Sequence, residues 1–254
     1  MTRSPRVHAQ WTLLLIAVQT LTRIPVAPDY GAGSLREATR WFPLVGAAIG
    51  LAAAALFTLA EPGLTALLAA LLSTAATLLL TGALHEDGLA DSADGLFGGR
   101  TRADALRIMQ DSRIGAFGAL GLGLVLAAKV ACLATLPRTA PYAAACALVA
   151  AHAASRFWLL LPATLLPYAR TAGLAASVAR PRATDLAIAA ACGLPPLLLL
   201  GPRAGPALLL SAAVAALFGL WVRHRLGGYT GDTLGATQQL TELAILLAAV
   251  WQAT

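Results

Sequence analysis

The sequence has few charged residues for its length. Of its 254 residues, 12% are charged and 58% are hydrophobic, and the mean hydropathy is +0.74. Because a globular chain has roughly 25% charged residues, these side chains are too few to cover a water-soluble particle. Intrinsic disorder needs low hydrophobicity and is excluded on the same grounds. The composition therefore predicts an all-α, polytopic transmembrane helix bundle.

Cysteine is also scarce. Cys132, Cys146 and Cys192 lie in apolar runs and form no CxxC pair. An odd number of cysteines argues against a disulfide framework, so we interpret them as small buried residues. We find no signal-peptide cleavage pattern, no repeat of fixed period and no stretch typical of a soluble domain. Residues 1–254 are therefore expected to form a single integral membrane domain.

Seven apolar runs are long enough to be membrane spans, since crossing roughly 30 Å of hydrocarbon takes about 20 residues. An eighth run, Trp11–Leu21, is shorter, and we expect an interfacial or re-entrant helix there. The sequence leaves open whether this run crosses. The predicted spans are Trp41–Ala60, Leu64–Leu84, Ile114–Leu136, Tyr142–Leu161, Ala183–Leu200, Ala204–Val222 and Thr233–Trp251.

Arginine is distributed unevenly among the loops between these spans. When the loops are assigned alternately to two sides, 12 basic residues fall on one side and only Arg138 and Arg203 on the other. The positive-inside rule places the first side in the cytoplasm, which predicts a multi-pass protein of the inner membrane. The same rule explains the net charge of +6 without a nucleic-acid partner. Two cytoplasmic loops stand out, an acidic loop over 85–113 and a glycine-rich loop over 223–232.

The acidic loop holds six of the twelve acidic residues of the chain. Asp87, Asp91 and Asp94 are spaced by four and three residues, which places them on one face of a helix. We expect this helix to extend the preceding span into the cytoplasm. A divalent cation would turn the repulsion between the carboxylates into attraction, and hard oxygen ligands favour Mg²⁺ or Mn²⁺. The spacing predicts a metal site, and a solvated acidic helix end is the alternative.

Glycines and arginines follow the acidic residues. The helix is expected to end near Gly95 and Gly98, and Arg113 lies beside Asp111 where the next span begins. Carboxylates that hold a metal, arginines that bind phosphate oxygens and a loose glycine-rich backbone suit phosphoanhydride chemistry. Orientation in the membrane and headgroup binding would also account for the arginines.

Three charged residues, Lys129, Arg156 and Glu242, lie inside predicted spans. Each is costly when exposed to lipid, so each is expected to face the bundle interior or water, although Lys129 can also snorkel. The glycine-rich loop leads into the last span through Gly231 and Asp232. These residues either offer backbone N–H groups to a phosphate or only cap the helix.

Several of these segments resemble the cobalamin synthase family, the adenosylcobinamide-GDP ribazoletransferases. The most specific is the string H-x-D-G-L-A-D-x-x-D-G within Thr81–Gly99. Further similarities follow the family's order over nearly the whole chain: Leu21–Val26, Trp41–Gly46, Ile108–Gly118, His152–Tyr168 and Leu226–Glu242.

The resemblance implies a Mg²⁺-dependent membrane phosphotransferase of cobalamin biosynthesis, with Mn²⁺ as an alternative metal. It would transfer the phosphocorrinoid moiety of adenosylcobinamide-GDP to α-ribazole or its 5′-phosphate and release GMP. Our hypothesis is that Asp87, Asp91 and Asp94 hold the metal. Asp111 would complete the metal shell or activate the ribose hydroxyl, and Arg113 would neutralise the leaving GMP. The expected substrate contacts are Arg23, His85, Glu86, Gly95, Gly98, Arg156, Gly231, Asp232 and Glu242.

Two other functions have to be weighed. CDP-alcohol phosphotransferases also carry an Asp-Gly acidic motif at the end of a span, but their pattern continues with Ala-Arg, whereas Leu89, Ala90 and Asp91 follow here. A transporter would place the three intramembrane charges along its path, yet the related halves of such proteins are missing. The expected partners are the two substrates and the lipid bilayer, and homo-oligomerisation is left open.

Overall fold

The structure is a computed structural model that describes residues 5–31, 33–136, 142–178 and 180–251. All regular elements in these ranges are helical. They are α1 (Pro5–Leu21), α2 (Leu35–Ala38), η1 (Thr39–Trp41), α3 (Phe42–Ala60), α4 (Ala66–Thr81), α5 (Leu84–Gly98), α6 (Arg102–Ile108), α7 (Ala116–Thr135), α8 (Ala143–Trp158), α9 (Leu160–Leu165), η3 (Leu174–Val178), α10 (Ala183–Gly193), η4 (Pro195–Arg203), α11 (Ala204–Leu226) and α12 (Gly231–Val250).

Five helical stretches are long and apolar enough to cross a membrane, and a sixth is added if α4 and α5 count as one bent span. The all-helical membrane bundle is thereby confirmed. The predicted span Ala183–Leu200 differs, because α10 ends at Gly193 and the chain continues as the 3₁₀-helix η4. Pro195 and Pro196 explain this change, because neither has a backbone N–H to continue the α-helical hydrogen bonds. At 11 residues, α10 alone is too short to cross a membrane.

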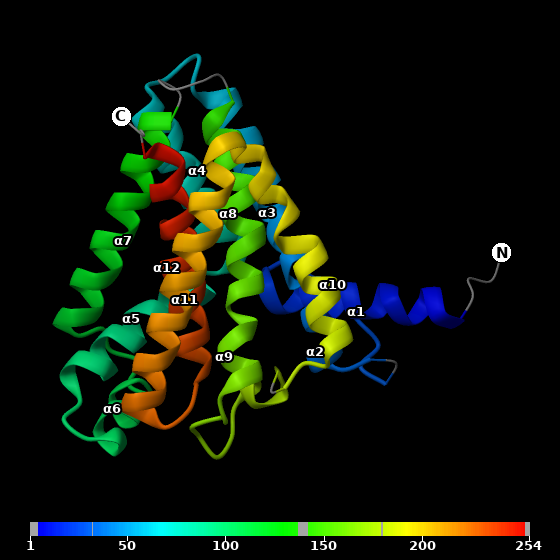
Figure 1. Cartoon of the computed structure of the whole chain (residues 1–254), viewed down its shortest axis with the longest axis vertical. Helices are drawn as coiled ribbons and strands as arrows, with labels where there is room; N and C mark the ends of the chain where they lie inside the picture. The colour runs from blue at the N-terminus through cyan, green and yellow to red at the C-terminus, as the bar shows by residue number, and fades with distance from the viewer. Residues whose placement is uncertain (1–4, 32, 137–141, 179, 252–254) are drawn as a thin grey trace.

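The bundle helices lie side by side along the long axis (Figure 1). One end of the bundle gathers α2, α5, α6 and the turn between α11 and α12, and the opposite end carries the turn between α3 and α4. The loops that the charge distribution assigns to one side therefore share one end. The largest apolar cluster lies between α3, α4, α7, α8 and α12 and is rich in alanine, which allows the helices to approach closely.

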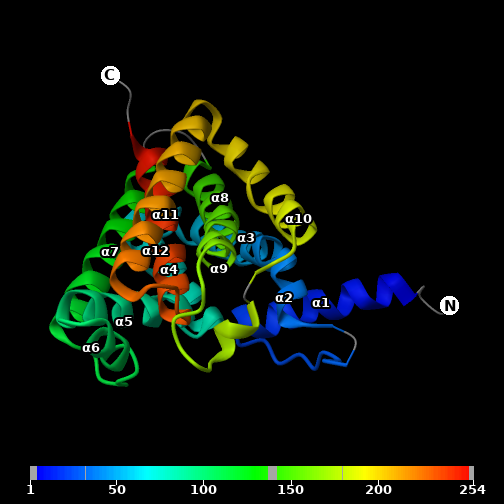
Figure 2. The same ribbon diagram turned by 60° about the horizontal axis from the view of Figure 1, so that its bottom comes forward.

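Helix α1 lies crosswise to the bundle in Figures 1 and 2. Its apolar part is short, Ala9–Leu21. Leu13, Ile16, Ala17 and Leu21 are buried against the bundle, and Trp11 is 48% exposed. This placement agrees with the short interfacial helix expected from the sequence.

Helix α5 forms as the aspartate spacing predicts, but it does not extend the preceding span. α4 and α5 meet at an angle of 91°. The turn is made by Gly82 and Ala83, with φ of 66° and 55°. Because this left-handed conformation disfavours a side chain, Ala83 is an unusual residue here. A Cβ on Gly82 would lie 2.4 Å from the Nε of Arg23, so Arg23 packs against the turn. The expectation that α5 continues the preceding span as one helix is therefore wrong.

Candidate active site

Asp94 caps a helix in this structure. Its two carboxylate oxygens accept hydrogen bonds from the backbone N–H groups of Gly115, at 2.6 Å, and Gly118, at 2.8 Å. These residues begin α7, where backbone N–H groups have no partner within the helix and favour a negative charge. Asp94 is buried, at 8% exposure. Its carboxylate therefore joins α5 to the start of α7.

The three aspartates predicted to hold one ion lie near one another along α5, and their metal binding stays a prediction. Among the residues that the structure describes, no group of three His, Cys, Asp or Glu side chains is arranged to hold a metal. Asp87 and Asp94 share a face of α5 but lie seven residues apart, roughly 10 Å along the axis. Both carboxylate oxygens of Asp94 already accept backbone hydrogen bonds, so binding an ion would compete with this helix cap. Asp87 and Asp91, one turn apart, remain compatible with a shared ion.

Asp91 lies among other carboxylates, with Arg170 as a nearby cation. Helix α5 lies crosswise at the end of the bundle (Figure 2). Burial, followed by the nearby carboxylates of Asp87 and Asp232, raises the pKa of Asp91 to about 7. Asp232 belongs to the first turn of α12, so the acidic group combines residues that are far apart in the sequence.

Two glycines allow α5 and α12 to approach. A Cβ on Gly88 would lie 2.8 Å from the carbonyl oxygen of Asp232, and a Cβ on Gly235 would lie 3.1 Å from that of His85. Larger residues would force the helices apart. This contact brings Asp87 and Asp232 to the same pocket.

The pocket beside these carboxylates has a volume of about 280 Å³. The ends of α1, α3 and α8 line it, together with α5, α12 and the segment after α9. Three predicted site residues besides Asp87 belong to the lining, namely His85, Gly231 and Asp232. The remaining polar or glycine residues of the lining are Thr20, Gly88, Tyr168, Arg170, Gly173 and Gly235.

Arg170 is the charged residue of the pocket lining that the sequence analysis did not single out. Its Nη2 atom lies 2.6 Å from Oδ2 of Asp232, and both side chains are largely buried, at 16% and 18% exposure. The segment that carries Arg170 is tied to the glycine-rich loop, since Tyr229 N–H donates to Pro167 and Ala169 N–H donates to Tyr229. No local pattern separates Arg170 from the other arginines of this side, so only the tertiary contact identifies it.

Asp111 and Arg113, the predicted catalytic residues, form an exposed pair. Arg113 donates to both carboxylate oxygens of Asp111, at 3.1 and 2.8 Å, and its side chain is 87% exposed. These bonds lower the pKa of Asp111 to about 2, so the carboxylate is a weak base in this arrangement. Neither residue belongs to the pocket lining, and their catalytic role stays a prediction.

The other predicted substrate contacts lie away from the pocket lining. A Cβ on Gly95 would lie 2.4 Å from Met109, so Gly95 packs against the end of α6. Gly98 has more room, with its nearest neighbour at 3.7 Å. Glu86, Arg156 and Glu242 are buried between α5, α8 and α12. Their contact with a substrate stays a prediction.

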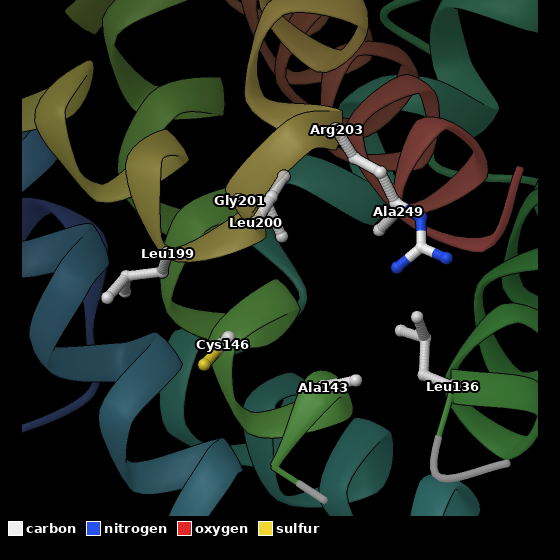
Figure 3. A pocket seen from close by; sticks show the side chains of 8 residues that line it. All are labelled: Leu136, Ala143, Cys146, Leu199, Leu200, Gly201, Arg203 and Ala249. Carbon is white, nitrogen blue, oxygen red and sulfur yellow. The ribbon is translucent and has the colours of Figure 1, made fainter. Parts of the chain in front are cut away.

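A second pocket, drawn in Figure 3, lies at the opposite end of the bundle, where α7 and α12 end and α8 begins. Its volume is about 210 Å³, and Arg203 is the charged residue in its lining. The other labelled residues are Leu136, Ala143, Cys146, Leu199, Leu200, Gly201 and Ala249. This lining offers apolar side chains and lacks the carboxylates of the first pocket, which therefore is the candidate active site.

The fold and this pocket define a polytopic membrane protein with an acidic, arginine-containing pocket at one end of its bundle. Residues 13–250 match the family model described as cobalamin-5-phosphate synthase. The adenosylcobinamide-GDP ribazoletransferase of Ralstonia pickettii (strain 12J) is 44% identical over 243 residues, 93% of this chain and 94% of the relative. That of Bradyrhizobium diazoefficiens is 46% identical over 244 residues, 93% of this chain and 92% of the relative. No solved structure matches. The chain belongs to the cobalamin-5-phosphate synthase family.

Proposed function

We propose that this chain is an adenosylcobinamide-GDP ribazoletransferase that acts in cobalamin biosynthesis. The similarity to enzymes of that name over nearly the full chain carries the proposal. The reaction joins adenosylcobinamide-GDP to α-ribazole or α-ribazole 5′-phosphate. The acceptor hydroxyl attacks the phosphorus on the corrinoid side, the bond to GMP breaks, and the hydroxyl proton passes to a base.

The charges of the pocket support a divalent cation in this reaction. Its lining holds two carboxylates, Asp87 and Asp232, and one arginine, Arg170, and Asp91 lies close by. A pyrophosphate is anionic and would be repelled by this excess of negative charge. Mg²⁺ commonly binds one or two carboxylates together with substrate phosphates, so Asp87 and Asp91, with Asp232 nearby, fit it. Bound there, it would neutralise charge on the pyrophosphate oxygens.

The residues of the chain would position the substrate. Arg170 has a planar fork suited to phosphate oxygens, and its present partner Asp232 occupies the place that such an oxygen would take. Gly231 and Asp232 begin α12, where backbone N–H groups and the helix dipole favour an anion. Most of the rate enhancement would come from positioning and electrostatics, as in other phosphoryl transfers.

A purified, detergent-solubilised assay tests the function. We expect GMP to be released only when adenosylcobinamide-GDP and an α-ribazole acceptor are both present. We expect chelation to stop the release and added Mg²⁺ to restore it, while Asp87→Asn removes it in a folded protein. Turnover of a CDP-alcohol donor instead would identify the competing class of phosphotransferase.

We also propose that the pocket faces the cytoplasm. The uneven arginine distribution supports this side. Replacing the native Cys132, Cys146 and Cys192 by Ala and introducing Arg100→Cys provides the test. An impermeant thiol reagent is expected to label this residue in inverted membrane vesicles and not in intact cells. Labelling of intact cells would reverse the proposed orientation.

A further inference from the structure

A buried polar network lies between α5 and the bundle. On the α12 side, Gln239 donates from Nε2 to Oε1 of Glu86, at 2.7 Å, and accepts from Nζ of Lys129, at 3.0 Å. Lys129 also pairs with Glu242. The network thus runs from α7 through α12 to α5.

The charges in this network balance. Lys129 and Arg156 carry positive charge, Glu86 and Glu242 carry negative charge, and all four are buried, at 5%, 1%, 7% and 2% exposure. Arg156 lies 3.9 Å from Glu242 and donates to the His152 carbonyl oxygen at 2.9 Å. An unpaired buried charge is strongly destabilising. Glu86 is held in the network by the hydrogen bond from Gln239 to its Oε1, and its Oε2 is buried without a hydrogen-bond partner among the described residues.

Glu86 directly precedes Asp87, and adjacent residues on a helix point about 100° apart. The inward side chain of Glu86 thereby sets the rotation of α5, whereas Asp87 lines the pocket. The left-handed turn at Gly82 and Ala83 separates α5 from α4. Because the helix is interrupted at this turn, α4 does not fix the direction of α5. Tertiary contacts have to fix it instead.

We propose that Gln239 is a positioning residue. By holding Glu86, it fixes the orientation of the helix that presents Asp87 to the pocket, with Asp91 one turn further along. This inference rests on the proposed function for its effect on catalysis, but its structural part is independent. Small errors in placing a reacting group have large kinetic costs, about 100-fold for 1 Å. Loss of the tie is thus expected to reduce kcat more than it changes KM.

The test compares variants that break or relocate the hydrogen bond. Gln239→Met keeps the size of the side chain but removes both the donor to Glu86 and the acceptor for Lys129. The double variant Glu86→Gln with Gln239→Glu exchanges donor and acceptor and keeps the total charge. Thr241→Val is the matched control, because Thr241 is buried on the same helix and bonds only to carbonyl oxygens of that helix, at Thr237 and Gln238.

Two readouts separate positioning from general stability. Hydrogen exchange of the peptide that covers Leu84–Gly98 reports how firmly α5 is held, and steady-state kinetics give kcat and KM. For Gln239→Met we expect exchange in α5 to rise and kcat to fall, each about tenfold, which is the factor for loss of about 1.4 kcal/mol. KM for adenosylcobinamide-GDP should stay within about threefold. The double variant should restore both, and Thr241→Val should change neither.

Each outcome decides the proposal. A folded Gln239→Met protein with wild-type protection of α5 and wild-type kcat would overturn it, as would a double variant that rescues neither. If Gln239→Met does not fold, Glu86→Asp takes its place, since it keeps the charge and shortens the reach. A wild-type chain without transferase activity would refute the proposed function, while the exchange data would still test the positioning of α5.

Discussion

Replacing Asp94 tests whether its carboxylate caps a helix or binds a metal ion. In Asp94→Asn, the amide oxygen can still accept one hydrogen bond, but the NH₂ group faces the second backbone N–H and cannot accept from it. The two bonds are 2.6 and 2.8 Å long and end on a charged, buried acceptor. Losing one bond of this kind costs about 2 kcal/mol. For a chain of this size, that predicts a fall in Tm of about 4–8 °C.

The assay measures thermal unfolding in detergent together with the Mg²⁺ concentration that gives half-maximal activity. We expect the Tm of Asp94→Asn to fall and the Mg²⁺ requirement of the folded fraction to stay unchanged. Asp104→Asn is the control, because Asp104 belongs to the same segment but its side chain is 43% exposed. A wild-type Tm with a raised Mg²⁺ requirement would refute the capping argument and return Asp94 to the metal site.

Three further variants test the pocket. Asp91→Asn removes repulsion between carboxylates, so we expect Tm to be maintained and GMP release to be lost; a lower Tm would show that the carboxylate stabilises the fold. Arg170→Gln is expected to raise KM for adenosylcobinamide-GDP about tenfold, through loss of a charged hydrogen bond, and an unchanged KM would remove the phosphate role. Gly235→Leu should separate α5 from α12, with a cost of about 1–3 kcal/mol and loss of activity. Gly123→Leu is its control, because a Cβ there meets nothing within 4 Å.

Local sequence patterns were enough to predict the long helices and the burial of the charged residues within them. Apolar run lengths gave the long helices, and the aspartate spacing gave α5. The cost of charge in lipid predicted that Arg156 and Glu242 face inward, and both are buried. Lys129, for which snorkelling was an alternative, is also buried and bound to Gln239. The partners of these residues come from other helices, so no local pattern specified them.

The direction of α5 was beyond local reasoning. A glycine followed by alanine does not by itself predict two consecutive left-handed residues, yet Gly82 and Ala83 turn the chain by 91°. That turn moves Asp94 onto the start of α7 and brings Asp87 towards Asp232. The place of Arg170 in the site was also beyond local reasoning, because its contact with Asp232 links residues 62 positions apart.

Within nine positions of α5, the acidic residues serve different purposes because of where the helix places them. Glu86 points into the bundle and balances buried cations, and Asp94 lies far enough along the axis to cap α7. Asp87 lines the pocket, and Asp91 lies one turn further along the helix. A helix that lies crosswise at the end of a bundle can contact several helices along its length, whereas a straight extension of α4 would leave its acidic residues in solvent. The bend therefore places one end of the acidic motif beside the pocket, while Glu86 and Asp94 hold α5 against α12 and α7.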